Sequence, residues 1–155
     1  MGTRFLAVLL AAGLGWSAMA DDAVGPRTFV AQLYLKALNN RHFSYVSPRL
    51  LAPDLYDLAQ RDGSAPNGAL EYDPICQCRD NDGVSARISS LAVTGDRAVA
   101  TILLQFDGTH PPPPQRVTLV LTHAPLAGWK IADIQSARVP SLKALLARRG
   151  GRSRG

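Results

Sequence analysis

Apolar residues recur at helical spacing close to the start of the chain. Within residues 26–40, apolar side chains are spaced one, four and five positions apart, and polar side chains occupy the other side. Pro26 suits the first position of a helix, so the pattern predicts a helix over residues 26–40. The apolar stripe consists of Phe29, Val30, Leu33, Tyr34, Ala37 and Leu38.

A second helical pattern follows Ser47, which is a good N-cap residue. Leu51, Leu55 and Leu58 have the i, i+4, i+7 spacing of one helix face, and Asp62-Gly63 ends the pattern. Pro53 either kinks this helix or restarts it, because proline removes a helical hydrogen bond and clashes with the preceding turn.

The second half of the chain alternates apolar and polar residues, as half-buried strands do. Strands are predicted over residues 87–93 and 97–106, and Thr94-Gly95-Asp96 forms the tight turn between them. Two more strands over residues 117–122 and 128–135 follow, and then a short helix over residues 142–149 that Ser141 caps.

These elements predict an α+β domain in which N-terminal helices pack on a curved antiparallel sheet, with a short C-terminal helix. The apolar face of such a sheet has to be covered, and the first helix carries a matching stripe. A sheet that wraps round a helix forms a cone with an open mouth. Tyr34 and Trp129 are candidates to line that mouth, although both residue types are more often part of the core.

Residues 1–20 have the pattern of a secretory signal peptide. Arg4 supplies the positive charge, a short apolar run follows, and Ala18-Met19-Ala20 is a small-x-small cleavage site. The apolar run is shorter than the ~20 residues that a membrane span needs. We therefore expect cleavage after Ala20, location in the periplasm and no stable membrane anchor in the mature chain.

Composition and charge fit one exported domain. The chain has 155 residues, of which 46% are hydrophobic and 19% are charged, which excludes a wholly disordered or multidomain protein. Residues 21–147 form the predicted domain and have no net charge, because the excess of arginine lies in residues 148–155. We expect that segment to be a disordered basic tail. A nucleic-acid-binding face is not expected, since such a face needs basic residues clustered on the domain.

Both cysteines fall in one short motif, Cys76-Gln77-Cys78. In an oxidising compartment a Cys76–Cys78 disulfide is the leading interpretation, although the segment would have to bend to bring the two sulfurs together. A redox-active pair is an alternative. A zinc site lacks two further ligands at suitable spacing, so no metal and no cofactor are predicted.

Acidic and aromatic residues surround the two cysteines. Asp73 could act as a general base with Tyr72 as a hydrogen-bond donor, a pairing that suits an isomerase or dehydratase. The alternative is that Asp73-Pro74 only forms a turn. Arg79 and Asp80, which follow the motif, and Asp133 further along the chain are candidates for a pocket or an interaction surface.

These residues resemble a family of exported bacterial proteins, the domain of unknown function numbered 3828, over about residues 25–147. The family is similar to the nuclear transport factor two-like cone fold, which implies a helix followed by an antiparallel meander and sometimes a homodimer. It usually has glutamine where Arg79 stands, so the resemblance assigns that side chain no role. The resemblance rests on residues 72–80, on residues 128–134 including Asp133, on residues 141–146, and on Phe29-Val30 and residues 47–50.

The sequence favours a non-catalytic binding or protein-interaction module, of which an immunity-type protein that blocks a toxin is one form. One alternative is a small-molecule enzyme that uses Asp73 and Tyr72, and another is a thiol-redox accessory protein that uses Cys76 and Cys78. The partner could be a protein or a small molecule, and the fold cannot choose among these functions.

Overall fold

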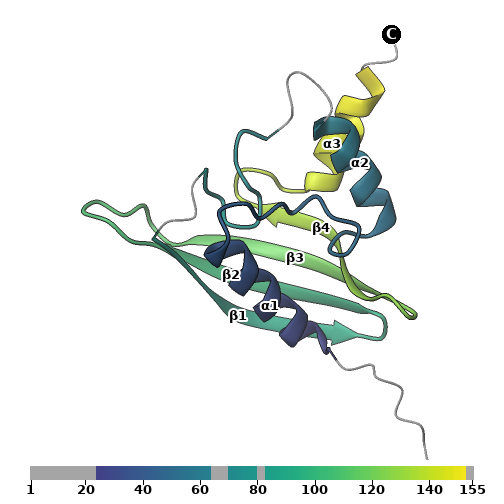
Figure 1. The fold of residues 1–155 in the computed structure, drawn as a ribbon, viewed down its shortest axis with the longest axis horizontal. Coiled ribbons are helices and arrows are strands. Elements are labelled where there is room, and N and C mark those ends of the chain that lie inside the picture. Colours follow the sequence, from purple (N-terminus) through teal and green to yellow (C-terminus); the bar gives the residue numbers. More distant parts are fainter. Residues whose placement is uncertain (1–23, 64–69, 80–82, 153–155) are drawn as a thin grey trace, which may run out of the picture.

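Four antiparallel strands form one sheet; one helix lies across one of its faces, and two more pack together at the edge of the last strand (Figure 1). The computed structural model describes residues 24–63, 70–79 and 83–152. The strands follow each other in the order β1-β2-β3-β4. The elements in chain order are α1 (Pro26–Asn39), α2 (Pro53–Gly63), β1 (Val84–Thr94), β2 (Arg97–Phe106), β3 (Gln115–Ala124), β4 (Gly128–Ser136) and α3 (Leu142–Arg152).

Two tight turns set the register of the outer strand pairs. Thr94 pairs with Arg97, which leaves a two-residue turn in which Gly95 has a φ of +58°. Glycine adopts this left-handed conformation without a steric cost, as expected for the predicted hairpin. The β3–β4 turn is one residue longer and contains Leu126, which also has a positive φ of 64°.

The core lies between the sheet and the helices. Every second residue of β2 and β3 points to this inner face, and these side chains are almost fully buried. The apolar stripe predicted for the first helix faces them, since Val30, Leu33, Tyr34 and Ala37 are all buried. The sheet contributes Ala98, Ala100, Ile102, Leu104, Val117, Leu119, Leu121, Trp129, Ile131 and Ile134 to this core.

The helices occupy two different ends of the sheet. The first helix, α1, contacts β1 and β2, whereas α2 and α3 contact β4 and each other (Figure 1). The prediction of N-terminal helices, an antiparallel sheet and a C-terminal helix is confirmed. The sheet is not strongly curled, in contrast to the expected cone, because the strands do not wrap round α1, which lies mainly across two of them.

Pro53 restarts a helix and does not kink one. Ser47 accepts the N–H groups of Leu50 and Leu51 through its carbonyl, which makes a single turn. The chain then runs beside β4, where the Ala52 N–H donates to the Ile131 carbonyl at 2.8 Å, and α2 begins at Pro53. This short extended segment is needed to bring the chain from α1 to the far edge of the sheet.

The last helix is longer than the sequence pattern predicts. It was expected to end at Arg149, but α3 continues to Arg152, so most of the expected basic tail is helical. Arg149 lies 4.0 Å from a carboxylate oxygen of Asp62 in α2, which favours a helical position for it. The predicted leader, its cleavage site and residues 153–155 lie outside the described residues.

Candidate functional site

The cysteine motif forms a tight closed loop. Asp73 and Cys78 make an isolated antiparallel bridge, in which the Asp73 N–H donates to the Cys78 carbonyl at 2.9 Å. Cys76 and Cys78 are joined by a disulfide, and their Cα atoms are 5.1 Å apart. Gln77 between them has a φ of +55°, which supplies the bend that an extended segment lacks. The leading interpretation of the cysteine pair is confirmed.

Asp73 holds the start of this loop. One of its carboxylate oxygens accepts the N–H of Ile75 at 2.7 Å, which is an Asx turn. Burial raises the pKa of the Asp73 carboxyl, while the N–H groups of Ile75 and Cys76 partly oppose the shift. The Gln77 amide also donates to the Pro74 carbonyl at 2.8 Å. The turn-forming role that was weighed against catalysis is thus present.

Three tyrosines surround the loop. The hydroxyl of Tyr34 donates to the carbonyl of Ile75 at 3.0 Å, so α1 is tied to the loop. Burial and the nearby Asp73 carboxylate raise the pKa of Tyr45 to about 12, and they also raise the pKa of Tyr34. The hydroxyl of Tyr72 is buried without a hydrogen-bond partner among the described residues. Tyr45 was not predicted, because it lies in the irregular segment after α1, where no periodic pattern identifies a buried side chain.

Arg138 also contacts this cluster. Its guanidinium carbon lies 5.4 Å from the centre of the Tyr72 ring, within the range of a cation–π interaction. Arg138 follows β4 and is distant from Tyr72 in the sequence, so only the fold brings them together. The sequence has no signal for this contact.

Two of the predicted pocket residues have structural roles. Trp129 is 9% exposed, lies in the core and meets the ring of His123 edge-on, with ring centres 5.2 Å apart. Asp133 receives the Ser141 hydroxyl at 2.7 Å and the Lys143 N–H at 2.9 Å. A carboxylate in this place satisfies free N–H groups at the start of α3. Neither residue lines the groove described below.

The residues after the motif are less informative. Arg79 makes an exposed ion pair with Glu71, with a nitrogen–oxygen distance of 2.9 Å. Exposed ion pairs contribute little to stability, typically about 0–1 kcal/mol. Asp80 lies outside the described residues.

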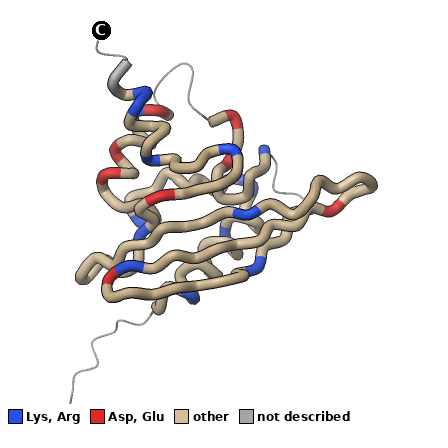
Figure 2. Tube along the Cα trace, turned by 180° about the vertical axis from the view of Figure 1, so that it is seen from behind, with Lys and Arg blue, Asp and Glu red and all other residues tan. Residues whose placement is uncertain are grey.

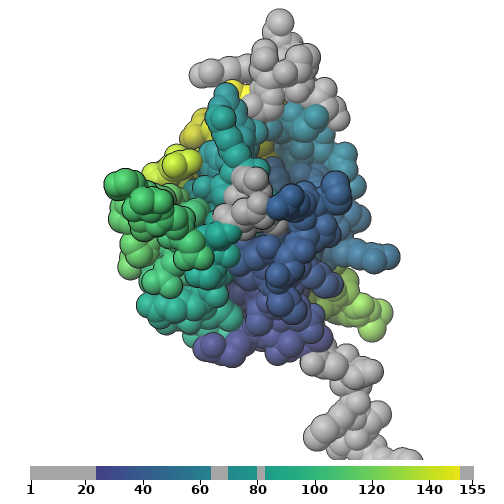
Figure 3. Space-filling model, turned by 60° about the vertical axis from the view of Figure 1, so that its left-hand side comes forward, coloured from purple at the N-terminus to yellow at the C-terminus, as the bar shows by residue number. Residues whose placement is uncertain are grey.

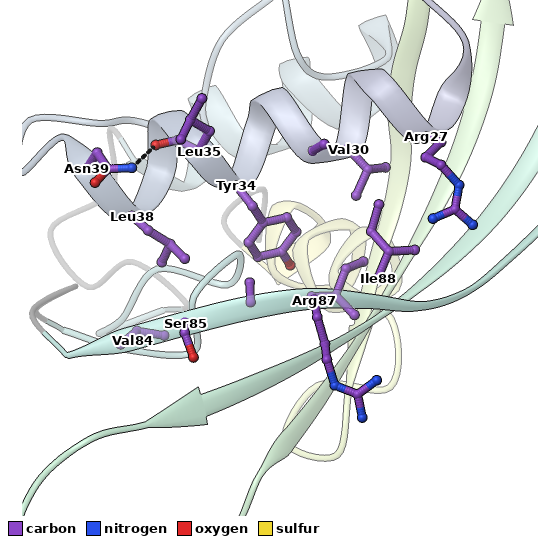
Figure 4. Close-up of a pocket in the computed structure, with 13 residues that line it drawn as sticks. Arg27, Val30, Tyr34, Leu35, Leu38, Asn39, Val84, Ser85, Arg87 and Ile88 are labelled. Carbon is purple, nitrogen blue, oxygen red and sulfur yellow. Dashed lines mark hydrogen bonds between the residues drawn. The ribbon is translucent and has the colours of Figure 1, made fainter.

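A groove runs between α1 and the first strand. Its volume is about 650 Å³, and its lining is mostly apolar. Figure 3 shows that α1 and the neighbouring strands lie side by side at this surface. In Figure 4, Val30 and Tyr34 point from the helix toward the strand, and Arg27 and Asn39 lie at opposite ends. The walls are formed by Arg27, Val30, Ala31, Tyr34, Leu35, Leu38, Asn39, Val84, Ser85, Ala86, Arg87, Ile88 and Ile102.

Tyr34 belongs to both the groove and the loop. Its ring lines the groove, while its hydroxyl bonds the loop at Ile75. It is the one predicted pocket residue that the structure places in the groove wall. The groove itself could not be predicted, because it depends on how closely α1 approaches β1.

The described residues hold neither a cluster of metal ligands nor a membrane-spanning helix. Among residues 24–63, 70–79 and 83–152, no three His, Cys, Asp or Glu side chains gather as a metal site would need. Within the same ranges, every helix is too short or too polar to cross a bilayer. Comparison with protein-family models, with curated proteins and with solved structures found no match to the chain.

Proposed function

We propose that the mature chain is an exported, non-catalytic binding module and that the groove between α1 and β1 is its binding site. The observation that carries this proposal is the groove itself, which is open and mostly apolar. Its volume of about 650 Å³ falls within the range of small-molecule sites, about 300–1,000 Å³. The lining favours a small apolar molecule as the ligand.

The bonds of the cysteine motif support a binding role over a catalytic one. The carboxylate of Asp73 holds the backbone of its own loop, and the two cysteines are bonded to each other. Neither Asp73 nor the disulfide lies in the groove wall. Groups that are committed to internal bonds are poorly placed to exchange protons or electrons with a ligand.

The proposed location is the periplasm, after cleavage of residues 1–20. A disulfide persists in oxidising compartments, which agrees with export. The order of helices and strands also agrees with the resemblance to the exported family and to the nuclear transport factor two-like fold. That relationship is part of the proposal, and the modest curl of the sheet argues for a flattened version of the cone.

The first test is mass spectrometry on protein that is exported by its own leader. The denatured mass is expected to correspond to a chain that begins at Asp21 with Cys76 and Cys78 bridged. The native mass is expected to exceed the denatured mass by the mass of one bound small molecule. The proposed site would be contradicted if the native mass showed no addition and the protein also did not bind the dye in the titration below.

A dye titration tests the groove directly. Ala31 lines the groove, so Ala31→Trp should fill it and weaken binding of 8-anilinonaphthalene-1-sulfonate by about tenfold, which is about 1.4 kcal/mol. Gln32 is exposed on α1 outside the groove wall, and Gln32→Trp is the matched control. Equal binding by both variants would place the dye, and the proposed site, elsewhere.

One observation favours a second function, an enzyme of the isomerase or dehydratase type. The pKa of Asp73 is raised by burial, as in many general bases, and the buried Tyr72 hydroxyl next to it lacks a partner among the described residues. This function predicts that Asp73→Asn abolishes turnover of a bound ligand while the fold is kept. A binding module predicts that the same variant retains the ligand unchanged.

A further inference from the structure

No described segment of the chain covers the face of the sheet that points away from α1. Figure 2 shows this outer face from behind, with the strands in front of the helices. Side chains that alternate with the buried ones point to it, and Val99 at its centre is 42% exposed. In β1, β2 and β3 the outer face consists of Ser85, Arg87, Ser90, Ala92, Thr94, Arg97, Val99, Thr101, Leu103, Gln105, Arg116, Thr118, Val120 and Thr122.

Strand register places these side chains in ordered rows. In one row Arg87, Leu103 and Arg116 are neighbours, so two arginines flank a leucine. In another row Val99 and Val120 are neighbours. Arg97 lies six residues from Leu103 on the same strand, which is about 20 Å in an extended chain. The outer face therefore has arginines at both ends, and between them Val99 and Leu103 flank a row of hydroxyls formed by Ser90, Thr101 and Thr118.

No acidic residue of the described ranges forms an ion pair with the arginines of this face. The strands β1, β2 and β3 contain Arg87, Arg97 and Arg116 but no aspartate or glutamate. None of these arginines forms an ion pair with a residue of the described part of the chain, and all three are exposed. Asp96 lies in the turn between β1 and β2, and Asp107 directly follows the last residue of β2.

The charged residues of β4 are occupied elsewhere. Lys130 donates to the carbonyls of Pro48 and Arg49 at 3.1 and 2.8 Å, beside the edge of the sheet. Asp133 accepts hydrogen bonds from the start of α3. Lys130 is itself a cation and adds no negative charge, and the Asp133 carboxylate, which pairs in register with Val120, is held by its bonds to the start of α3.

We propose that the outer face of the sheet binds a protein partner that presents acidic and apolar side chains. Acidic groups would meet Arg87, Arg97 and Arg116, and apolar groups would cover Val99 and Leu103. This interface meets the groove at β1, where Ser85 and Arg87 belong to both, whereas Arg97, Val99, Leu103 and Arg116 lie outside the groove wall. It also fits an immunity-type protein, which acts by covering another protein.

The charges and hydroxyls on the face decide between occupants. A second copy of the chain would bring cations against cations, because β1, β2 and β3 carry three arginines on this face and no carboxylate, and Asp133 lies at the β4 edge. A lipid surface would also meet the arginines, but among the described residues of this face Val99 is the only exposed large apolar side chain, so little apolar area would enter a bilayer. A protein partner can cover Val99 and Leu103 and also bond the hydroxyls of Ser90, Thr101 and Thr118.

A glutamate–tyrosine copolymer is the probe for this interface, and polyglutamate is its purely acidic counterpart. The full mature chain should bind the copolymer more tightly than it binds polyglutamate. The triple variant Arg87→Gln, Arg97→Gln and Arg116→Gln should bind it at least about tenfold more weakly. The control variant Arg49→Gln, Arg61→Gln and Arg148→Gln loses the same charge from exposed positions outside the outer face, and it should stay within about twofold.

Val99→Ser tests the apolar part of the outer face. It should weaken binding of the copolymer but leave binding of polyglutamate unchanged, since only tyrosine needs an apolar contact. All substituted positions are exposed, and circular dichroism checks that each variant is folded. Binding by the wild type should also fall more steeply with salt than binding by the outer-face triple variant.

Three results would overturn the proposal. Equal losses in the two triple variants would mean that binding follows total charge and not this face. A dimer in sedimentation that the outer-face variant dissociates would assign the face to a second copy. Binding to phosphatidylglycerol vesicles in preference to the copolymer would assign it to a membrane surface.

Discussion

The two edges of the sheet differ in how completely they are covered. At the β4 edge, Leu50 and Ala52 pair with Ile131, and the helices α2 and α3 pack beside the strand. At the β1 edge no described segment pairs with the strand, and α1 leaves a groove beside it. The chain thus closes one edge with backbone bonds and helices and leaves the other edge accessible.

This difference separates residues that hold the fold from residues that are free to bind. Asp133 is a candidate site residue in the sequence, yet at the closed edge both Asp133 and Lys130 bond to other parts of the chain. At the open edge, Arg27 and Arg87 have no ion pair with any residue in the described ranges. A polar residue is thus a better functional candidate where the fold leaves it unpaired.

The largest contrast is expected between leucines at the two ends. Leu55 in α2 is 0% exposed, and Leu55→Ala should lower the free energy of unfolding by about 2–5 kcal/mol through the cavity it leaves. Leu35 in α1 is 65% exposed, and Leu35→Ala should change the free energy of unfolding by less than about 0.5 kcal/mol. Urea denaturation measures both, and similar losses would refute the contrast.

A smaller effect is expected for the carboxylate that caps α3. Asp133→Ala should lower the free energy of unfolding by about 1–3 kcal/mol, because the Lys143 N–H and the Ser141 hydroxyl lose their acceptor. Asp57 is exposed on α2, and Asp57→Ala is the control with little expected change. A stable Asp133→Ala variant would show that water replaces the cap.

The loop next to the open end should respond to pH. Because burial raises the pKa of Asp73, its favourable contribution is complete below the ordinary value of 3.8 and is lost as the pH rises through the folded-state pKa. Asp73→Asn keeps an oxygen for the Ile75 N–H but carries no charge. At pH 7 this variant should therefore be at least as stable as the wild type, and the difference should shrink toward pH 4. Thermal melts across this range test the sign, and a variant that is less stable at pH 7 would contradict it.

The smallest effect is expected at the ion pair between α2 and α3. The hydrogen bond from Lys143 lowers the pKa of Asp54, so its contribution is present above the ordinary value of 3.8 and is lost as the pH falls through the lowered pKa. Both groups are largely exposed, so Lys143→Ala should cost less than about 1 kcal/mol at neutral pH. Denaturation at neutral and acidic pH measures the difference, and a loss that persists at acidic pH would exclude the ion pair as its cause.

Much of the fold follows from periodicity. The apolar stripe of α1 and the alternation in β2 identify their elements within one or two residues, because burial of one face requires that spacing. The start of β1 was predicted at Arg87 but lies at Val84, since Val84 and Ala86 become half-buried only when α1 covers them. The curl of the sheet was overestimated, because curl depends on how the helices seat and not on the alternation.

The site was less predictable than the fold. The disulfide follows from two cysteines and an oxidising compartment, but the positive φ of Gln77 that permits it has no sequence signal. Asp133 caps the helix that follows its strand, and Arg138 contacts Tyr72, which lies much earlier in the chain. Neither pair of residues belongs to a sequence repeat that would reveal the contact. Such contacts depend on tertiary packing, which local patterns do not encode.

The irregularity in β1 has a consequence for solubility. The register of β1 against β2 shifts between Ile88 and Ser90, and Ser89 at the shift bonds the Thr101 carbonyl with its hydroxyl at 3.1 Å. An exposed edge strand can template the growth of fibrils by pairing with the same strand of other molecules. A bulge interrupts continuous pairing, so the chain can keep this edge accessible at high concentration without polymerising along it.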